Sequence, residues 1–448
     1  MEFNLNYTKK GNKISIASYL LFAISLSGFY TLFSYGMLKG YFSFFFLSFV
    51  YFLIGCLIFQ KKSRHFFRIA FGCNLILLIL FALYFESLNG SPFIGGGDDE
   101  NFYEKALTIL AGKTAALGNY PFYIYINTGI FKFLNFFGFY DNSSLNIGVT
   151  NAFIGATVAP LMYRVGQQFL SFKSFNNLGY LLAVFPATMY FSSVLLRDIW
   201  VLAILVWIIF ILTVARLNIV LKILILGFLC LVSFNFRHAT GAITILFVLA
   251  YGFFSLDNKP LKIIIAGTGI FIFFVFFLTM FSALQTTIFE QYQGLGIVGA
   301  ESGSIGAKIA FSSNPVVRSL YYIISLYNPI PPFPNSRFNT VFLGFGAIIW
   351  YFIIPYFFFG IYKAIKSSDK KIKALTFSSI VLIVALMWIM FIISGTVRHR
   401  LMLFPIGFLF YFLYKDHLTL KFHVNVRFLY NTIIVSMFCL YTFVKLLM

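Results

Sequence analysis

Long apolar runs constrain this chain more than any other feature of its sequence. A membrane-spanning helix needs roughly 20 apolar residues, and runs of about that length follow one another along most of the 448 residues. They are continuous, whereas the strands of a membrane barrel would alternate apolar and polar residues. The runs lie at about 14–36, 41–60, 66–87, 148–165, 178–196, 199–214, 219–235, 240–255, 262–283, 341–363, 374–394, 401–415 and 428–447. They predict an all-α polytopic membrane protein with about 13 transmembrane helices.

The composition excludes the soluble classes of protein. Hydrophobic residues make up 60% of the chain and charged residues only 10%, against about 45–50% and about 25% in soluble domains. A net charge of +20 would indicate nucleic-acid binding in a soluble protein. In a membrane protein the same Lys and Arg set the topology and contact anionic lipid, so we expect membrane lipid and no nucleic acid as a partner. The four cysteines lie at scattered spacings within apolar runs and predict neither a disulfide framework nor a zinc site.

The distribution of charge predicts which face is cytoplasmic. Most of the 33 Lys and Arg fall on one side if the N-terminus is cytoplasmic, with the densest groups at 61–68 and 363–373. Most of the 13 Asp and Glu then fall outside, together with two large segments at about 88–147 and 284–340 that should carry short helices. The aromatic, interrupted stretch 120–138 is interpreted as a helix lying on the membrane surface, with a further span as the alternative. We expect one membrane-embedded domain whose chemistry takes place at the external leaflet.

An acidic cluster opens the first external segment. Three glycines (95–97) precede Asp98, Asp99 and Glu100, and an apparent helix follows. Carboxylates at a helix start are stabilised by the helix dipole, so the cluster is explained in part as a capped turn. Acidic side chains at a membrane boundary are costly unless they are used. We therefore expect the cluster to supply a general base or to bind a divalent cation. Such a cation is the only cofactor that the sequence suggests.

Basic residues recur at the predicted external tips, where the positive-inside rule disfavours them. The planar guanidinium fork of Arg matches phosphate oxygens and stays charged. Several Arg at one leaflet would suit a lipid-linked phosphate, whereas each alone is also explained as a headgroup anchor. The candidates for phosphate or donor binding are Arg197, Arg237, His238, Arg398, His399, Arg400, Arg318 and Arg337.

Four stretches follow one another in the first half of the chain. They are DDENFYEKA (98–106), GNYPFYIYINTGIFKFLNFFGFY (118–140), NAFIGATVAPLMYRVGQQF (151–169) and AVFPATMYFSSVLLRD (183–198), with a weaker match near 395–405. In this order they resemble the GT-C superfamily of membrane glycosyltransferases. The resemblance is to its bacterial members similar to the protein O-mannosyltransferase and aminoarabinose transferase group.

The resemblance implies transfer of a sugar from a polyprenyl-phosphate-linked donor to a hydroxyl of a glycan, lipid or protein acceptor. Such enzymes work at the external face of the bacterial inner membrane in cell-envelope polysaccharide biosynthesis. The family's acidic pair falls on Asp99 and Glu100, which makes Asp99 the base, or Asp98 if the match slips by one residue. Residues 1–65 would form an extra N-terminal hairpin before a core at 66–283, with C-terminal helices over 341–448.

Two other functions compete with this one. A polysaccharide polymerase or ligase of the O-antigen type would also place Arg on several external tips, but it would not depend on Asp99. A transporter of a lipid-linked glycan ranks third, because transporters usually show repeats and charged or broken helices near the midplane. The acidic cluster is therefore the feature that distinguishes the candidates.

Overall fold

The computed structural model describes residues 38–94, 98–115, 121–283, 337–392 and 400–416, with residues 428, 430–432 and 435–436 near the C-terminus. About 85% of this part of the chain is helical, and it contains no strands. The all-α prediction is therefore confirmed for these residues. The predicted span 14–36 and most of the predicted span 428–447 and of the segment 284–340 lie outside them.

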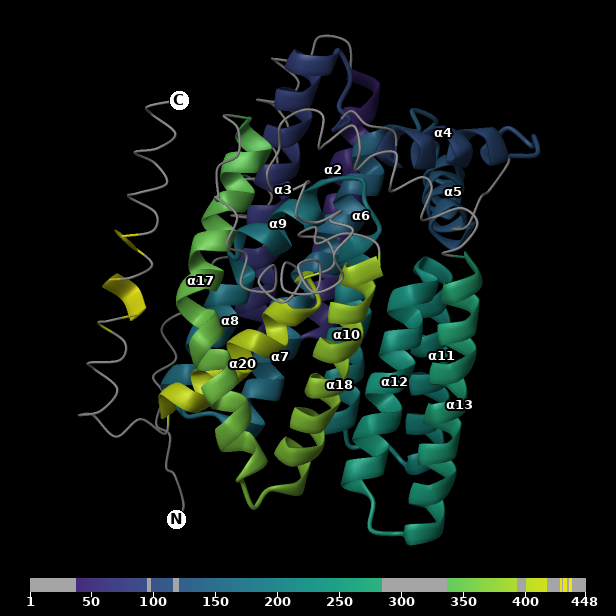
Figure 1. Ribbon diagram of the computed structural model, residues 1–448. Coiled ribbons are helices and arrows are strands. Elements are labelled where there is room, and N and C mark those ends of the chain that lie inside the picture. Colours follow the sequence, from purple (N-terminus) through teal and green to yellow (C-terminus); the bar gives the residue numbers. More distant parts are fainter. Residues whose placement is uncertain are drawn as a thin grey trace, which may run out of the picture.

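The helices form a bundle whose members run mostly along one axis (Figure 1). They are α2 (Leu38–Ile58), α3 (Lys61–Asn89), α4 (Asp98–Leu110), α5 (Pro121–Phe136), α6 (Ser144–Ala156), α7 (Val158–Phe169), α8 (Phe172–Ala183), α9 (Pro186–Ser193), α10 (Asp198–Thr213), α11 (Ile219–Phe236), α12 (His238–Ser255), α13 (Lys259–Ala283), α17 (Phe338–Ile365), α18 (Lys370–Ile392) and α20 (Leu403–Asp416).

The bundle has two chemically different ends. At one end lies α4 with its three acidic residues, and we call this the α4 end (Figure 1). At the opposite end short loops join α12 to α13 and α17 to α18, and we call this the basic end because lysines 363, 366, 370 and 371 lie there. The same end holds Asp416, whose carboxylate accepts hydrogen bonds from Ser171 at the start of α8.

Five helical segments in the described residues are long and apolar enough to cross a membrane, which supports an integral membrane protein. They are α3, the α6–α7 pair, α11, α12 and α17. Each coincides with a predicted span, because each is one continuous apolar run. The predicted count of 13 spans is not confirmed.

One predicted span is interrupted in the structure. The run 178–196 is broken into α8 and α9, and Pro186 stands in the first turn of α9. Proline has no N–H to donate and disfavours a helical residue before it, so one helix ends and another begins there. By contrast, α20 has 14 residues, most of them buried, and covers nearly all of the predicted run 401–415.

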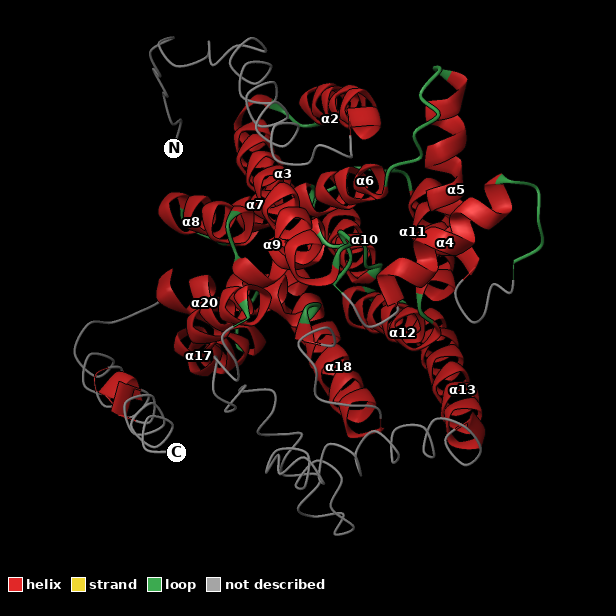
Figure 2. Cartoon of the chain, turned by 90° about the horizontal axis from the view of Figure 1, so that it is seen from above, coloured by secondary structure: helices red, strands yellow, loops and turns green. Residues whose placement is uncertain are grey.

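The helices α4 and α5 lie across the end of the bundle rather than along it (Figures 1 and 2). The ring of Phe102 in α4 meets the ring of Tyr123 in α5 edge to face at 5.2 Å. The hydroxyl of Thr128 in α5 donates to the backbone oxygen of Ala106 in α4. The two helices therefore pack against each other across the α4 end of the bundle.

Burial separates the core of the bundle from its apolar outside. α10 and α6 are buried along almost their whole length. α11 and α13 instead expose large apolar side chains, among them Ile223, Phe228, Ile263 and Phe271, each more than 60% exposed. A water-soluble protein rarely leaves so continuous an apolar face open, whereas lipid covers one readily.

Candidate functional site

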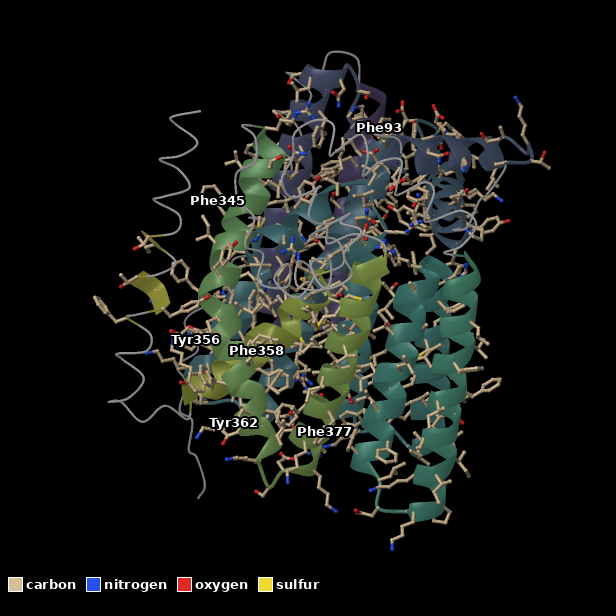
Figure 3. The ribbon with its side chains drawn as sticks, in the orientation of Figure 1. Phe93, Phe345, Tyr356, Phe358, Tyr362 and Phe377 are labelled. Carbon is tan, nitrogen blue, oxygen red and sulfur yellow. The ribbon has the colours of Figure 1, made fainter. Side chains whose placement is uncertain are left out.

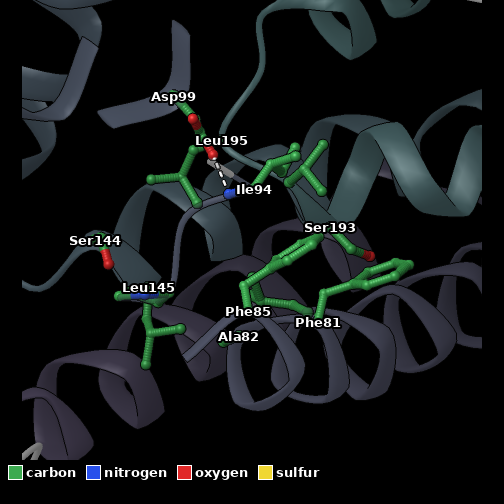
Figure 4. A pocket seen from close by; sticks show the side chains of 12 residues that line it. Phe81, Ala82, Phe85, Ile94, Asp99, Ser144, Leu145, Ser193 and Leu195 are labelled. Atoms are coloured by element: carbon green, nitrogen blue, oxygen red, sulfur yellow. Dashed lines mark hydrogen bonds between the residues drawn. The ribbon is translucent and has the colours of Figure 1, made fainter. Parts of the chain in front are cut away.

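Asp99 is buried at the start of α4, while its neighbours Asp98 and Glu100 are exposed. The backbone N–H of Ile94 donates to Asp99 Oδ2 at 2.6 Å, so the carboxylate fixes the segment that enters the helix (Figure 4). Among the described residues, Asp99 Oδ1 has no hydrogen-bond partner. Asp99 Oδ2 is therefore held by a backbone N–H, whereas Oδ1 is available to accept a hydrogen bond.

The phase of α4 explains which acid is buried. Asp99, Phe102 and Ala106 are the buried residues of this helix, and they stand at i, i+3 and i+7. Residues at this spacing share one face of a helix. Packing of Phe102 and Ala106 against the bundle therefore turns Asp99 inward, and it turns the adjacent acids about 100° to either side.

Asp99 lines a narrow pocket formed by α3, the start of α6 and the segment after α9. Its walls include Phe81 and Phe85 from α3 and Leu195 from the segment before α10 (Figure 4). The enclosed free space is about enough for one water molecule. The pocket therefore has the size of a single hydroxyl group rather than of a sugar ring.

The possible divalent cation at Asp98, Asp99 and Glu100 stays a prediction. Asp99 is buried, whereas Asp98 and Glu100 are exposed. In the part of the chain that the structure describes, no three His, Cys, Asp or Glu side chains are grouped as metal ligands.

Arg197, Asp198 and Arg237 lie together at the α4 end. Arg237 Nη1 donates to Asp198 Oδ1 at 3.1 Å, and the two side chains are 17% and 7% exposed. This contact joins the tip before α10 to the tip between α11 and α12. The predicted convergence of basic residues from different helices is thus observed for these two tips, with Asp198 as the group that holds one of them.

Arg197 connects this ion pair to the acidic helix. Its guanidinium carbon lies 5.2 Å from the centre of the Phe102 ring, which is a cation–π contact. Phe102 follows Asp99 by three residues on the same face of α4. The pocket that Asp99 lines also includes residues 193–195, which immediately precede Arg197 in the chain. Asp99 and Arg197 therefore belong to one site.

Asn151, in the middle of α6, positions this site and was not among the candidates from the sequence. It is fully buried, and its Nδ2 donates to the backbone oxygens of Val194 at 2.7 Å and Leu196 at 3.1 Å. Its Oδ1 accepts from Trp200 Nε1 at 2.8 Å. One amide thus fixes both ends of the tip that carries Arg197 and Asp198. A single amide within an apolar run was the signal that could have identified it.

Tyr123 of α5 completes the buried polar group. Its hydroxyl accepts from Asn151 Nδ2 at 3.1 Å. Burial raises the pKa of Tyr123 well above its ordinary value, and hydrogen bonding to Asn151 opposes this only in part. The hydroxyl therefore stays protonated at physiological pH and acts as a neutral hydrogen-bonding group.

The remaining basic candidates are placed elsewhere. Arg400 is 5% exposed and lies within electrostatic range of Tyr351 in α17. His238 is exposed and its ring lies 4.7 Å from that of Phe234 in the same hairpin, and Arg337 is exposed at the start of α17. Arg318, Arg398 and His399 lie outside the described residues.

Comparison with protein-family models, with curated proteins and with solved structures found no match to the chain. The function is therefore argued from the site itself.

Proposed function

We propose that this protein is a membrane glycosyltransferase that moves a sugar from a polyprenyl-phosphate-linked donor to an acceptor hydroxyl at the α4 end. The observation that carries the proposal is the placement of Asp99. It is a buried carboxylate with one oxygen unoccupied, in a pocket the size of a hydroxyl group, on the helix that Arg197 also contacts.

The proposed reaction needs a base and a phosphate-binding group on either side of the sugar. The acceptor hydroxyl enters the pocket and gives its proton to Asp99 Oδ1 as its oxygen attacks the anomeric carbon of the donor. The bond from that carbon to the phosphate oxygen breaks, and the carrier phosphate leaves with the electron pair. Guanidinium groups of Arg197 and Arg237 stabilise the negative charge that develops on the leaving phosphate.

In this proposal Asp198 positions the guanidinium of Arg237 and balances its charge. It accepts from Arg237, so it holds a guanidinium in place while no phosphate is bound. A phosphodiester that approaches must share Arg237 with Asp198 or replace it as the partner. The same carboxylate also compensates the charge of a cation that would otherwise be buried alone, which is expensive.

The test is a radiolabel transfer assay with a matched pair of variants. Membranes that contain the protein are incubated with a panel of decaprenyl-phosphate-linked sugars, and label is followed into lipid, glycan and protein fractions. Asp99→Asn retains an oxygen that can accept from Ile94 but cannot take a proton, so we expect a loss of about 10²–10⁴-fold in rate. Glu100→Gln removes an exposed neighbouring charge and should cost little. If Asp98→Asn is inactive and Asp99→Asn active, the base is Asp98.

The guanidinium groups are tested by conservative substitution. Arg197→Lys and Arg237→Lys keep the charge but lose the bidentate fork, so donor affinity should fall in both. Lys at 237 can still pair with Asp198, which keeps the fold. If both variants keep normal donor affinity and rate, Arg197 and Arg237 do not bind the donor phosphate and only anchor their helices at the lipid headgroups.

A polysaccharide polymerase or ligase is the second candidate, because Arg197 and Arg237 are joined at one end of the bundle as such an enzyme would also require. It differs from the transferase in its donor, a diphosphate-linked oligosaccharide, and its activity would not require Asp99. Incorporation from diphosphate-linked oligosaccharides that survives Asp99→Asn would favour it over the transferase.

The orientation is tested by cysteine labelling in a background without the native cysteines. Asn101→Cys, exposed on α4, should react with an impermeant thiol reagent in intact cells, whereas Ser368→Cys, exposed at the basic end, should not. The opposite pattern would place the α4 end in the cytoplasm and exclude a donor in the external leaflet.

A further inference from the structure

A recess at the basic end carries an inference that is independent of the transfer reaction. It has a volume of about 1000 Å³ including its open mouth, and it is formed by the ends of α7, α17 and α20 and the start of α18. Its floor is apolar and buried, with Ala364, Ile372 and Leu413 at 1%, 3% and 6% exposure. A cavity of this size accommodates a phospholipid headgroup and the first part of its acyl chains.

The rim of the recess is polar and basic. Lys363 and Lys366 line it from the last turn of α17 and the residue that follows, with Ser368 from the loop to α18. Neither lysine forms an ion pair with any described residue, whereas Lys370, four residues further on, is paired with Asp257 at 2.9 Å. The two ammonium groups on the rim are therefore available to an anion.

One carboxylate also faces the recess. Asp369 lines it, and its Oδ1 accepts from the backbone N–H of Lys371 at 2.7 Å, so it caps the start of α18. Two ammonium groups against one carboxylate leave the recess a net charge of +1. That charge complements a single phosphodiester and does not favour a zwitterionic headgroup, which brings its own ammonium group.

Aromatic side chains indicate that the recess lies at the level of lipid headgroups. Phe359 and Tyr362, in the last two turns of α17, are 46% and 53% exposed, and Tyr362 lies near the basic end in Figure 3. Lys366 Nζ donates to the Tyr362 hydroxyl and lies over its ring. Exposed aromatic rings followed by lysines at the end of an apolar helix are typical of the membrane–water interface.

We propose that this recess binds one anionic phospholipid, with the phosphodiester between Lys363 and Lys366 and the upper acyl chains on the apolar floor. Basic pockets between membrane helices bind anionic headgroups in this way. A soluble anion would gain only the contacts at the rim, and it would leave the apolar floor in contact with water.

The experiment measures lipid binding to the purified protein by native mass spectrometry. Phosphatidylglycerol should bind at least about tenfold more tightly than phosphatidylcholine, and sodium chloride should weaken its binding. In Lys363→Gln/Lys366→Gln the preference should fall to about twofold or less. The control Lys113→Gln/Lys132→Gln removes two exposed lysines at the α4 end and should keep the wild-type preference.

Three outcomes would overturn the proposal. The first is equal affinity of the wild type for both lipids. The second is an equal loss of preference in the test and control variants, which would make the effect one of overall charge. The third is displacement of phosphatidylglycerol by millimolar inorganic phosphate, which would make the recess a site for a soluble anion. Size-exclusion profiles that match the wild type establish that both double variants are folded.

Discussion

The two ion pairs of the described residues lie at opposite ends of the bundle and differ chiefly in burial. Arg237 and Asp198, at the α4 end, are 17% and 7% exposed at an N–O distance of 3.1 Å. Lys370 and Asp257, at the basic end, are 68% and 82% exposed at 2.9 Å. The distances are nearly equal, so the surroundings of the charges make the difference. One pair is withdrawn from water and the other is solvated on both sides.

The same contrast extends to the other charged residues. The buried charged residues in the described part of the chain are Asp99, Arg197, Asp198 and Arg400. All four come from segments that the charge pattern predicts to be external. Burial of a charge is expensive, and buried charges are therefore concentrated where a function uses them. Three of the four, Asp99, Arg197 and Asp198, lie at the α4 end, which is where we propose that the reaction takes place.

Removal of one partner from each pair gives the largest expected difference. Asp198→Asn removes the carboxylate charge from the ion pair with Arg237, and breaking a buried pair costs about 3–5 kcal/mol. The lower part of that range is expected because Arg237 can turn towards solvent. Asp257→Asn should leave the unfolding free energy nearly unchanged. Unfolding in mixed micelles measures both, and equal losses would show that burial does not separate the two ends.

Asn151→Ala tests whether one amide organises the site. It removes the donor to Val194 and Leu196 and the acceptor from Trp200, so we expect a loss of about 2–3 kcal/mol. Asn74→Ala is the matched control, because Asn74 is equally buried but makes one side-chain bond, to the Ala152 oxygen, and should cost about 1 kcal/mol. Donor affinity should fall only in the first variant. If both variants lose the same stability and keep donor affinity, Asn151 is an ordinary core residue.

A pair of glycines tests how closely the tip at Arg237 is packed. A Cβ at Gly241 would lie 2.2 Å from the backbone of Phe234, so Gly241→Ala must push α12 away from α11 beside Arg237. Overpacking of this kind costs about 1–3 kcal/mol. A Cβ at Gly227 in α11 would meet nothing within 4 Å, and Gly227→Ala should be neutral or slightly stabilising. Equal melting temperatures for the two variants would contradict the close approach.

The sequence predicted the elements better than it predicted the site. Continuous apolar runs predicted α3, α11, α12 and α17 well, because hydropathy alone decides a helix that faces lipid. The same measure missed the break at Pro186, since an apolar run is counted without regard to the missing N–H of proline.

Within the site, the sequence identified the acidic cluster, but Asp99 was selected from it by the family resemblance and not by the helix pattern. Which of three adjacent acids faces inward depends on helix phase, and the phase is set by Phe102 and Ala106. That pattern was present in the sequence and would have favoured Asp99. The pairing of Arg237 with Asp198 depends on how two hairpins pack, which no local pattern encodes.

The smallest expected effect concerns the pH dependence of the exposed pair. Hydrogen bonding to Lys370, and then its charge, lower the pKa of Asp257 below its ordinary value. A carboxylate with a depressed pKa in the folded state contributes stability at pH values above its unfolded pKa of about 3.9. That contribution is lost as the pH falls through the folded pKa, so the difference between wild type and Lys370→Gln should become smaller in acid. Since both side chains are solvated, sodium chloride near neutral pH should also remove it.

The measurement is the melting temperature of the two proteins from pH 7 to pH 3, at low and high salt. We expect a small difference at pH 7 and low salt, a smaller one at pH 3, and none at high salt. Asp198→Asn provides the internal comparison, because its deficit at pH 7 should persist in high salt, where a buried pair is screened far less. A salt-sensitive deficit in Asp198→Asn would show that water reaches the α4 end as freely as it reaches the basic end. Asp99 would then be solvated like the carboxylates at the basic end, and its burial would no longer support the proposal that it is the general base.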